Sequence, residues 1–441
     1  MDLERTARNA GVSGVGGGNF PTHVKLRGPA DTVIANGAEC EPFLQADRQV
    51  VALHAPRVLM GLLAVMDHKG AREGVIVLKK RYEEADKSLR AAIAAQGAGD
   101  RVRIHYVPDC YPAGDEQQLV YAVTGRVVPR GGLPGDVGAA VFNVGTLMNL
   151  ANALRGKRYT EKYVTVAGAV KTPCTLMVPV GTRAAELLAA AGGVTEPCVF
   201  IVGGPCMGVL HDTEDFAVTK AVNGILALPK DHPYLRKRSL ENDWTKARSA
   251  CAHCNKCTPL CPRNALGLNV QPHKLMRALA NGVEHSPDYL GAFACSECGV
   301  CRDYVCTDGL NPVKAMQELK ARLTKAGLAP DHTVPASPDR NFETRNVPFS
   351  RLLNRMGLEK YDVPAPLNPR LMNIQTVRIP LDNGFGPAKP VVKKGDWVRK
   401  GRLIADIPDQ AVSVKMHASL SGRVTAVTRT YIEIRREKKP T

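Results

Sequence analysis

Short apolar runs alternate with longer segments of helical spacing in the first third of the chain. Runs rich in β-branched residues predict strands at 31–36, 74–79 and 101–107. Apolar residues recur at helical spacing in segments 45–67, 82–94 and 115–124. This order of strand, helix and strand predicts a parallel sheet with crossover helices.

The polar and apolar pattern changes in two later parts of the chain, which are rich in strands. Between 159 and 208, apolar runs are interrupted by Gly and Pro, with one Ala-rich helix at 184–191. From 372 to 436 the pattern is again that of short strands, with hairpin turns at Gly395 and Gly401. The spacing of these turns resembles the barrel-sandwich hybrid of biotinyl and lipoyl domains.

Two further stretches separate these units. A cysteine-rich stretch from about 246 to 323 closes with a predicted helix at 312–323. The stretch from about 330 to 369 is rich in Pro, Asn and Arg, shows little periodicity, and is expected to be a linker or a surface-wrapping segment. We therefore expect a multidomain α/β + β chain, divided at 1–155, 156–232, 233–325, 326–370 and 371–441.

Composition narrows the cellular setting. The longest apolar stretch, 58–66, is too short to span a bilayer, and the first residues lack the apolar core of a signal peptide. We expect a cytoplasmic protein that does not span a membrane. The formal charge of +17 favours an acidic partner, but the basic residues are scattered and only 5% of residues are aromatic, which argues against nucleic-acid binding.

The strongest chemical signal lies in the cysteines. Of 13 in the chain, eight fall in two runs: Cys251, Cys254, Cys257 and Cys261, then Cys295, Cys298, Cys301 and Cys306. The first run reads C-x2-C-x2-C-x3-C-P, the pattern of ferredoxins with two 4Fe-4S clusters, in which the fourth cysteine ligates the other cluster. We therefore expect one cluster on Cys251, Cys254, Cys257 and Cys306, and a second on Cys295, Cys298, Cys301 and Cys261.

Other uses of these cysteines fit less well. Zinc sites commonly take two separated C-x2-C pairs, and disulfides need an oxidising compartment. The second run departs from the ferredoxin pattern, since one extra residue precedes Cys306 and Thr307 stands where Pro is usual. This departure removes no ligand, although it can change the geometry of one cluster.

A glycine-rich loop near the N-terminus is the second motif. The sequence GVGGGNFPTHVK spans 14–25, and its glycines allow a phosphate or a flat ring to approach the backbone amides closely. Lys25 adds a positive charge. No strand precedes the loop, so it is not a Rossmann fingerprint, and a flexible turn is the alternative interpretation.

Four segments together resemble a known family. The loop 14–25, the segment 36–42 (NGAECEP), the segment 114–116 (GDE) and the segment 142–147 (FNVGTL) look like the FMN- and NADH-binding fold of the flavoprotein subunit of respiratory complex I. In this chain the loop contains PTHVK and the segment 36–42 contains ECEP. These two details are similar to the C subunit of Rnf complexes and to cobalamin reductases of propanediol-utilisation microcompartments. Segment 163–182 resembles the β-grasp ligand-binding domain of these families.

Domain order distinguishes these relatives. In the Rnf protein the barrel-sandwich domain precedes the flavin fold, whereas here the similar segment is at the C-terminus. The chain thus resembles the cobalamin reductases over nearly its whole length. The resemblance implies a Rossmann-like FMN/NADH-binding domain, a β-grasp domain, a two-cluster ferredoxin-like module and a C-terminal barrel-sandwich hybrid.

The resemblance also implies the ligand-binding residues. Residues expected at FMN are Gly14, Gly16, Lys25, Asn36, Glu39, Gly114, Asp115, Asn143 and Thr146. Residues expected at NADH are Phe20, Glu41 and Glu116. Two positions depart from the complex I pattern, because Asn19 replaces Gly and Ala38 replaces Asp, which removes one flavin contact.

The implied function is electron transfer from NADH, which gives two electrons as hydride, through FMN to clusters that accept one electron each. The implied acceptor is a corrinoid, presented with a corrinoid adenosyltransferase, in or at the shell of a bacterial microcompartment and near its shell proteins. Two alternatives stay open. One is an Rnf-like conduit without a cobalamin role, and the other is a structural flavoprotein scaffold.

Overall fold

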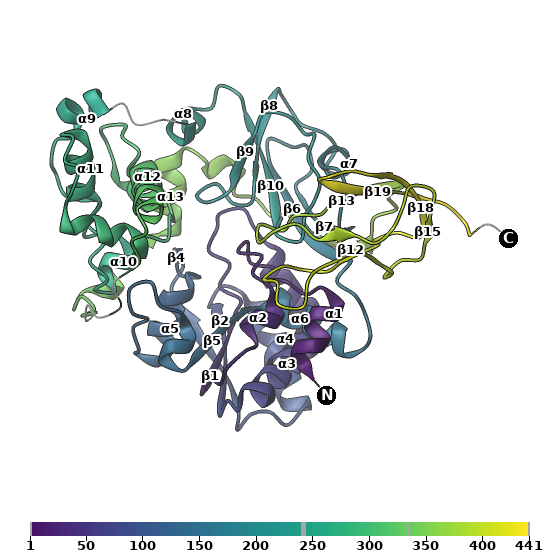
Figure 1. The fold of residues 1–441 in the computed structure, drawn as a ribbon. Helices are drawn as coiled ribbons and strands as arrows, with labels where there is room; N and C mark the ends of the chain where they lie inside the picture. Colours follow the sequence, from purple (N-terminus) through teal and green to yellow (C-terminus); the bar gives the residue numbers. More distant parts are fainter. Residues whose placement is uncertain (1, 240–243, 331, 333–335, 440–441) are drawn as a thin grey trace.

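The computed structural model describes residues 2–239, 244–330, 332 and 336–439. Figure 1 shows an α/β domain at the N-terminus, a strand-rich domain beside it, a helical cysteine-rich module, and a second strand-rich domain at the C-terminus. The multidomain α/β + β architecture expected from the sequence is confirmed.

The N-terminal domain is built on a parallel sheet. Its strands are β1 (Thr32–Asn36), β2 (Glu73–Lys79), β3 (Val102–Val107) and β5 (Ala139–Asn143), in the order β3-β2-β1-β5. All three pairings are parallel. From β1 the chain adds β2 and β3 on one side of the sheet and then returns to add β5 on the other side of β1. The carboxyl ends of β1 and β5 therefore meet at a topological switch point, where α/β sheets bind ligands.

Helices cover both faces of this sheet. One apolar cluster joins it to α1 (Leu3–Ala10), α3 (Ala46–Lys69), α4 (Glu83–Ala95) and α6 (Val144–Leu154). Another joins its opposite face to α5 (Glu116–Thr124). Helix α3 is long and apolar enough to cross a membrane by length and composition, but it packs here against α4, α6 and the sheet, which is the place of a core helix.

The second domain is a mixed six-stranded sheet. Its order is β12-β7-β6-β10-β8-β9, where β6 is Glu161–Gly168, β7 Cys174–Pro179, β8 Cys198–Val202, β9 Val209–His211, β10 Gly224–Pro229 and β12 Leu367–Leu371. Helix α7 (Ala184–Ala190) packs on it through Leu187 and Leu188. The outer strand β12 comes from far along the chain and pairs in parallel with β7.

The cysteine-rich module is helical. Helix α8 (Pro233–Ser239) leads to α9 (Trp244–Ala250), α10 (Pro262–Ala265), α11 (Pro272–Ala280), η2 (Pro287–Ala294), the π-helical turn η3 (Cys301–Val305) and α12 (Pro312–Lys325). Helices α9, α11, α12 and η2 share one small apolar core. The cysteines of both runs lie in the loops between these helices, except Cys301, which begins η3.

The C-terminal domain is a sandwich of two small sheets. One contains β13 (Thr376–Pro380), β19 (Tyr431–Arg436), β18 (Gly422–Val427) and β15 (Trp397–Val398), and the other contains β14 (Lys389–Pro390), β16 (Leu403–Asp406) and β17 (Met416–His417). A single apolar cluster fills the space between them. Gly395 and Gly401 adopt φ of 97° and 86°, so the expected turns need glycine there.

The segment expected to lack periodicity contains a strongly amphipathic helix, α13 (Phe349–Met356). It follows η4 (Phe342–Arg345) and the short strand β11 (Val347–Pro348), which pairs with β4 (Cys110–Tyr111) of the N-terminal domain, and it precedes η5 (Glu359–Tyr361). Its buried side chains belong to the core of the second domain. The expectation of a linker or surface-wrapping segment is therefore wrong for 349–356, because a helix of only two turns gives too short a pattern of apolar residues to stand out in the sequence.

This position predicts a stability effect for Leu352, which is fully buried in that core. We expect Leu352→Ala to cost about 2–5 kcal/mol, since it leaves a cavity where domains meet. The apparent unfolding temperature in scanning calorimetry is the measurement, with Arg351→Ala, an exposed neighbour on the same helix, as the control. Equal unfolding temperatures for both variants would show that α13 is not part of the core.

Candidate functional site

The switch point of the parallel sheet carries two asparagines. Asn36 ends β1 and Asn143 ends β5, and the two residues are register partners. The Asn143 side chain caps α6, because its Oδ1 accepts a hydrogen bond from the amide of Gly145 at 2.8 Å. The amino end of α6 therefore opens at the edge of the sheet where a phosphate binds most readily.

The glycine-rich loop lies over this edge. It connects α1 to α2 (Thr22–Lys25), and the amide of Val15 donates to Oγ1 of Thr146 at 3.0 Å. Gly16, Gly17 and Gly18 are exposed, and Gly17 adopts φ of 94°. Within the described part of the chain, the amides of Gly16 and Gly18 donate to no other group, so they are available to a ligand.

Lys25 supplies the positive charge expected beside the loop. Its Nζ lies 5.6 Å from the centre of the Phe142 ring and forms an ion pair with Glu116, the first residue of α5. Both side chains remain partly exposed, at 30% and 39%. The structure thus brings together the loop, Lys25 and Glu116, three parts of the expected site.

The residues at this edge of the sheet fit the phosphate of FMN. The donor set of free loop amides, an ammonium group and a helix amino end is that of a phosphate site. A Cβ at Gly17 or Gly18 would meet nothing within 4 Å, so the open side of the loop has room for a ligand. Thr146 and Asn143 hold the loop and the helix in place.

Asn36 and Glu39 hold the neighbouring loop. Nδ2 of Asn36 donates to the carbonyl of Gly114 at 3.0 Å, and its Oδ1 accepts from the amide of Ala38 at 3.1 Å. Glu39 adopts φ of 34° and accepts the amides of Asp47 and Arg48 at the start of α3. These expected flavin residues therefore order the backbone around the site.

Two buried carboxyl groups lie behind the site. Burial raises the pKa of Glu39, and repulsion from Asp47 adds to the rise. Burial also raises the pKa of Asp47, while its bond from Nδ2 of Asn143, at 2.7 Å, acts in the opposite direction. Burial therefore favours the neutral form of both carboxyl groups, which limits their repulsion of an anionic ligand.

Glu41, which is expected at a ribose of NADH, contacts the second domain. Its carboxylate accepts the amides of Cys206 and Met207, each at 3.0 Å, and its Oε1 lies 3.1 Å from the hydroxyl oxygen of Tyr111. A Cβ at Gly204 would lie 2.0 Å from its Oε2, so that loop of the second domain packs directly on it. Glu41 thus accepts bonds from groups of the protein, and the ribose contact expected of it stays a prediction.

Asp115, which is expected at the flavin, has partners within the protein for both of its carboxylate oxygens. One carboxylate oxygen caps α5 through the amides of Gln117 and Gln118. The other accepts from the guanidinium of Arg263 at 2.8 Å, and both side chains are about nine-tenths buried, at 11% and 10% exposed. Asp115 therefore joins the N-terminal domain to the cysteine-rich module, while Gly114 remains close to Asn36.

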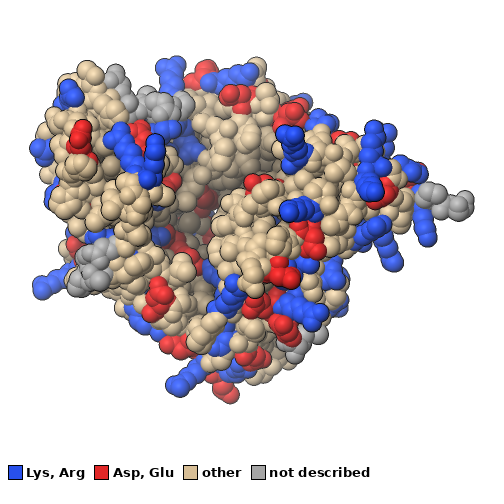
Figure 2. All heavy atoms as spheres, in the orientation of Figure 1, with Lys and Arg blue, Asp and Glu red and all other residues tan. Residues whose placement is uncertain are grey.

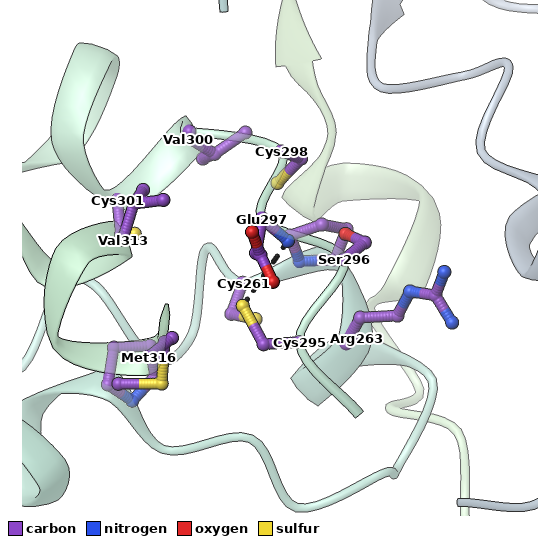
Figure 3. Close-up of a pocket in the computed structure, with 13 residues that line it drawn as sticks. Cys261, Arg263, Cys295, Ser296, Glu297, Cys298, Val300, Cys301, Val313 and Met316 are labelled. Carbon is purple, nitrogen blue, oxygen red and sulfur yellow. Dashed lines mark hydrogen bonds between the residues drawn. The ribbon is translucent and has the colours of Figure 1, made fainter. Parts of the chain in front are cut away.

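Four cysteines line one cavity beside this junction. They are Cys261, Cys295, Cys298 and Cys301, and Figure 3 shows them around a common space with Arg263 at its edge. The hydroxyl of Tyr111 donates to the carbonyl of Cys298 at 2.7 Å. This is the ligand set that the ferredoxin pattern predicts for one cluster.

The other four cysteines line a second cavity in the same module. They are Cys251, Cys254, Cys257 and Cys306, and Cys254 is exposed. Across the described ranges, no three or more His, Cys, Asp or Glu side chains lie close enough to hold a single metal ion. The four sulfurs of each cavity are thus too far apart for one metal ion, but they fit an iron–sulfur cube, which binds cysteine sulfurs around its outside.

The extra residue in the second run is accommodated as a π-helical turn. The amide of Cys306 donates to the carbonyl of Cys301 at 3.0 Å, which is an i to i+5 bond. The widened turn places Arg302 and Asp303 inside, where they form a buried ion pair at 2.6 Å. Arg302 also donates to the carbonyl of Cys206 at 2.8 Å, so the insertion connects the module to the second domain.

The remaining cysteines stand outside both cavities. Cys40, Cys110, Cys174, Cys198 and Cys206 have free thiols and line neither cavity. Burial raises the pKa of Cys40 to about 12, so this thiol stays protonated beside Gly114.

Comparisons with known families match each part of the chain. Residues 7–152 match the Nuo51 FMN-binding domain, 163–210 the SLBB domain, 250–311 the 4Fe-4S dicluster domain and 369–439 the RnfC barrel sandwich hybrid domain. Cobalamin reductases PduS of Citrobacter freundii and of Salmonella typhimurium are each 38% identical over 441 residues, which cover 98% of this chain and 96% of theirs.

The chain belongs to the family of PduS cobalamin reductases. It is accordingly an oxidoreductase with an FMN-binding domain and a 4Fe-4S dicluster domain, and it transfers electrons. The C subunit of the Na+-translocating ferredoxin:NAD+ oxidoreductase complex of Acetobacterium woodii is 37% identical over 275 residues, which cover 61% of this chain and 59% of that protein.

A solved structure supports the fold. The chain aligns with an NAD+-reducing [NiFe]-hydrogenase in the H2-reduced state at 21% identity and a TM-score of 0.50, over 76% of this chain and 68% of that one. At this identity the likeness concerns the arrangement of elements alone.

Several residues that build the site carried no signal in the sequence. Asp47, Tyr111 and Arg263 act through contacts with distant segments, at separations of 96, 187 and 148 residues. The one local hint was that Arg263 follows the Cys-Pro pair, near a predicted cluster ligand.

The loop geometry predicts the effect of Gly16→Val. A Cβ at this position would lie 3.1 Å from Nδ2 of Asn143, so the branched side chain displaces the cap of α6 and covers the loop amides. We expect FMN affinity to fall about tenfold or more, as the loss of one charge-assisted phosphate contact implies. Fluorescence titration with FMN is the measurement, and the iron content should not change.

Gly99→Val is the matched control. Gly99 is exposed, and a Cβ there would meet nothing within 4 Å. Unaltered FMN affinity in the Gly16 variant would place the flavin elsewhere.

Proposed function

We propose that this protein is an NADH-dependent reductase that delivers single electrons to a corrinoid. The observation that carries this proposal is the placement of two four-cysteine cavities in one module, which a buried ion pair and a hydrogen bond join to the flavin domain. When bound, FMN would supply the conversion of hydride into single electrons, and the two sets of cysteines would hold clusters that accept one electron each. The chain's own residues bind and orient these groups.

The two cavities differ in their surroundings, which gives the electron path a direction. The cavity of Cys261, Cys295, Cys298 and Cys301 adjoins the flavin domain through Arg263 and Tyr111. The cavity of Cys251, Cys254, Cys257 and Cys306 is bordered by an exposed loop. We infer that electrons enter at the first set and leave from the second, near Cys254.

NADH would meet the exposed side of the glycine loop. Phe20 is half-buried at the end of this loop, and Glu116 lies beside Lys25. An aromatic ring can stack on the nicotinamide or the adenine, and a partly exposed carboxylate can accept ribose hydroxyls. With Glu41 engaged elsewhere, these two residues are the candidates for recognition.

The corrinoid acceptor rests on the relatives. The proteins named cobalamin reductase align with 98% of this chain over 96% of their own length, so the likeness includes every domain. We propose that the partner is a corrinoid, or a corrinoid adenosyltransferase that holds it, and that the protein works in the cytoplasm within or at the shell of a microcompartment. The face in Figure 2 shows Lys and Arg scattered among acidic side chains, which gives nucleic acid no continuous basic track there.

A second function has its own support. The similarity to the C subunit of an ion-translocating oxidoreductase over 61% of the chain favours a conduit that passes electrons to a protein partner without a role for cobalamin. The two functions share NADH, FMN and both clusters, so only the acceptor separates them.

Iron content tests the cluster assignment. We expect about eight irons per chain after anaerobic reconstitution, and about four in Cys254→Ser or Cys298→Ser, because each removes one ligand from a different cube. NADH should still reduce the remaining cluster in Cys254→Ser but not in Cys298→Ser, if the order of the path is right. Low-temperature electron paramagnetic resonance of NADH-reduced samples is the measurement.

Cys198→Ser is the control, since this thiol lies outside both cavities. About four irons in the unaltered protein, or stoichiometric zinc, would contradict two cubes. Equal reduction by NADH in both ligand variants would contradict the order.

The acceptor is tested with cob(II)alamin under anaerobic conditions. With NADH, FMN-loaded protein, an adenosyltransferase and ATP, we expect the absorbance spectrum of an adenosylated corrinoid to grow with time. The Cys254→Ser variant should lose this activity while it keeps NADH-dependent reduction of ferricyanide at the flavin. Brisk ferricyanide reduction without alkylated corrinoid in the unaltered protein would leave the conduit as the function.

A further inference from the structure

A loop of the C-terminal domain reaches the glycine-rich loop of the N-terminal domain. The loop runs from Asp382 to Pro387, which pair as an isolated β-bridge. Figure 1 shows this domain, in yellow, lying against the first part of the chain, in purple. The two loops are far apart in the sequence, with a separation of 364 residues between Asn19 and Asn383.

The two loops are joined by a buried hydrogen bond. Nδ2 of Asn19 donates to the carbonyl of Asn383 at 2.6 Å, and Oδ1 of Asn19 accepts from Ser13 at 2.7 Å. Asn19 has φ of 46°, a backbone conformation that Gly usually fills and that Asn tolerates. The departure from Gly at this position therefore has a structural use, because the amide side chain fixes the C-terminal loop on the glycine loop.

Phe385 stands at the tip of this loop. Its ring centre lies 5.3 Å from that of Phe20, with the rings perpendicular, so an edge of one ring meets the face of the other. Phe385 is 39% exposed. Gly384 and Gly386 flank it with φ of 89° and 104°, and a Cβ on either would meet nothing within 4 Å. The aromatic ring is thus presented on a narrow turn, outside any apolar core.

The C-terminal loop is itself held firmly. Asn383 is buried, and Ser413 donates to the carbonyl of Gly386 at 2.7 Å. The position of Phe385 relative to Phe20 is therefore set by hydrogen bonds on both sides of the interface. An aromatic residue held in this way loses little conformational freedom when a ligand packs against it.

We propose that Phe385 is a nucleotide-positioning residue, which fixes the ring of Phe20 and forms with it one aromatic wall of the NADH site. This inference rests on the proposed use of NADH. The C-terminal domain is then a working part of the dinucleotide site, in addition to any role in assembly. The ligand it helps to position is the planar ring system of a nicotinamide dinucleotide.

The test is NADH binding to FMN-loaded, iron-loaded protein under anaerobic conditions. We expect Phe385→Ala to raise the Kd for NADH about three- to tenfold, which is the effect of losing one aromatic contact. In steady-state assays with ferricyanide, the KM for NADH should rise while kcat is unchanged, because the contact is present in both the ground and the transition state. FMN content and the apparent unfolding temperature should not change, and Phe385→Tyr should restore the Kd.

Two further variants keep the outcome decisive. Val391→Ala removes an exposed apolar side chain elsewhere in the same domain, 53% exposed, and should behave as the unaltered protein. Asn19→Gly keeps the backbone conformation but removes the bond to Asn383, so it should raise the Kd in the same direction, even if Phe385→Ala does not fold.

The outcomes separate this inference from the proposed function. If the unaltered protein binds no NADH, both fail. If it binds NADH and the Kd of Phe385→Ala and Asn19→Gly stays within about twofold of the unaltered value, only the role of Phe385 is overturned. If Phe385→Ala raises the Kd but also loses FMN or lowers the apparent unfolding temperature, the contact is purely structural. That result would also overturn the role of Phe385 in positioning the nucleotide.

Discussion

The buried ion pair between Arg263 and Asp115 determines how the flavin domain and the cysteine-rich module meet. Both groups are about nine-tenths buried, and removal of either partner from such a pair leaves an uncompensated buried charge. Asp115 caps α5 with its other oxygen, and Arg263 lies two residues after Cys261. One carboxylate thus connects α5, which borders the flavin site, with α10, which borders a cluster cavity.

A second path of contacts joins the same units through the SLBB domain. Glu41 accepts the amide of Cys206, while Arg302 donates to the carbonyl of the same residue. The loop around Cys206 is therefore held from the flavin side and from the cluster side at once. Burial raises the pKa of Glu41 to about 7, so the carboxyl group at this interface is partly protonated near neutral pH.

Long-range strand and helix contacts complete the assembly. Strand β12 extends the sheet of the SLBB domain, and α13 fills part of its core, although both follow the cysteine-rich module in the sequence. The C-terminal sandwich then returns to the N-terminus, where Asn383 meets Asn19. The chain is therefore wound back on itself, which brings residues from distant domains to the glycine-rich loop and to the first cavity.

Local patterns and their chemistry could be predicted from the amino-acid sequence. Apolar periodicity located three strands of the parallel sheet, β1, β2 and β3, and the helices α3, α4, α5, α7 and α12, whereas β5 and helices such as α1 and α6 were missed. Cysteine spacing divided eight ligands into two sets that the structure brings together. These features depend on near neighbours, so they are visible in a short window. The glycine loop and Lys25 were recognised for the same reason.

The contacts of the polar side chains at the site, in contrast, depend on how the domains pack. Glu41 and Asp115 belong to two of the segments that resemble the flavoprotein family. Their partners, however, are Cys206 and Arg263, which lie in other domains. A carboxylate pairs with whichever donor the fold places within about 3 Å, and no sequence window contains that donor. The meeting of Phe20 with Phe385 has the same cause, because it exists only after the C-terminal domain has packed against the first loop.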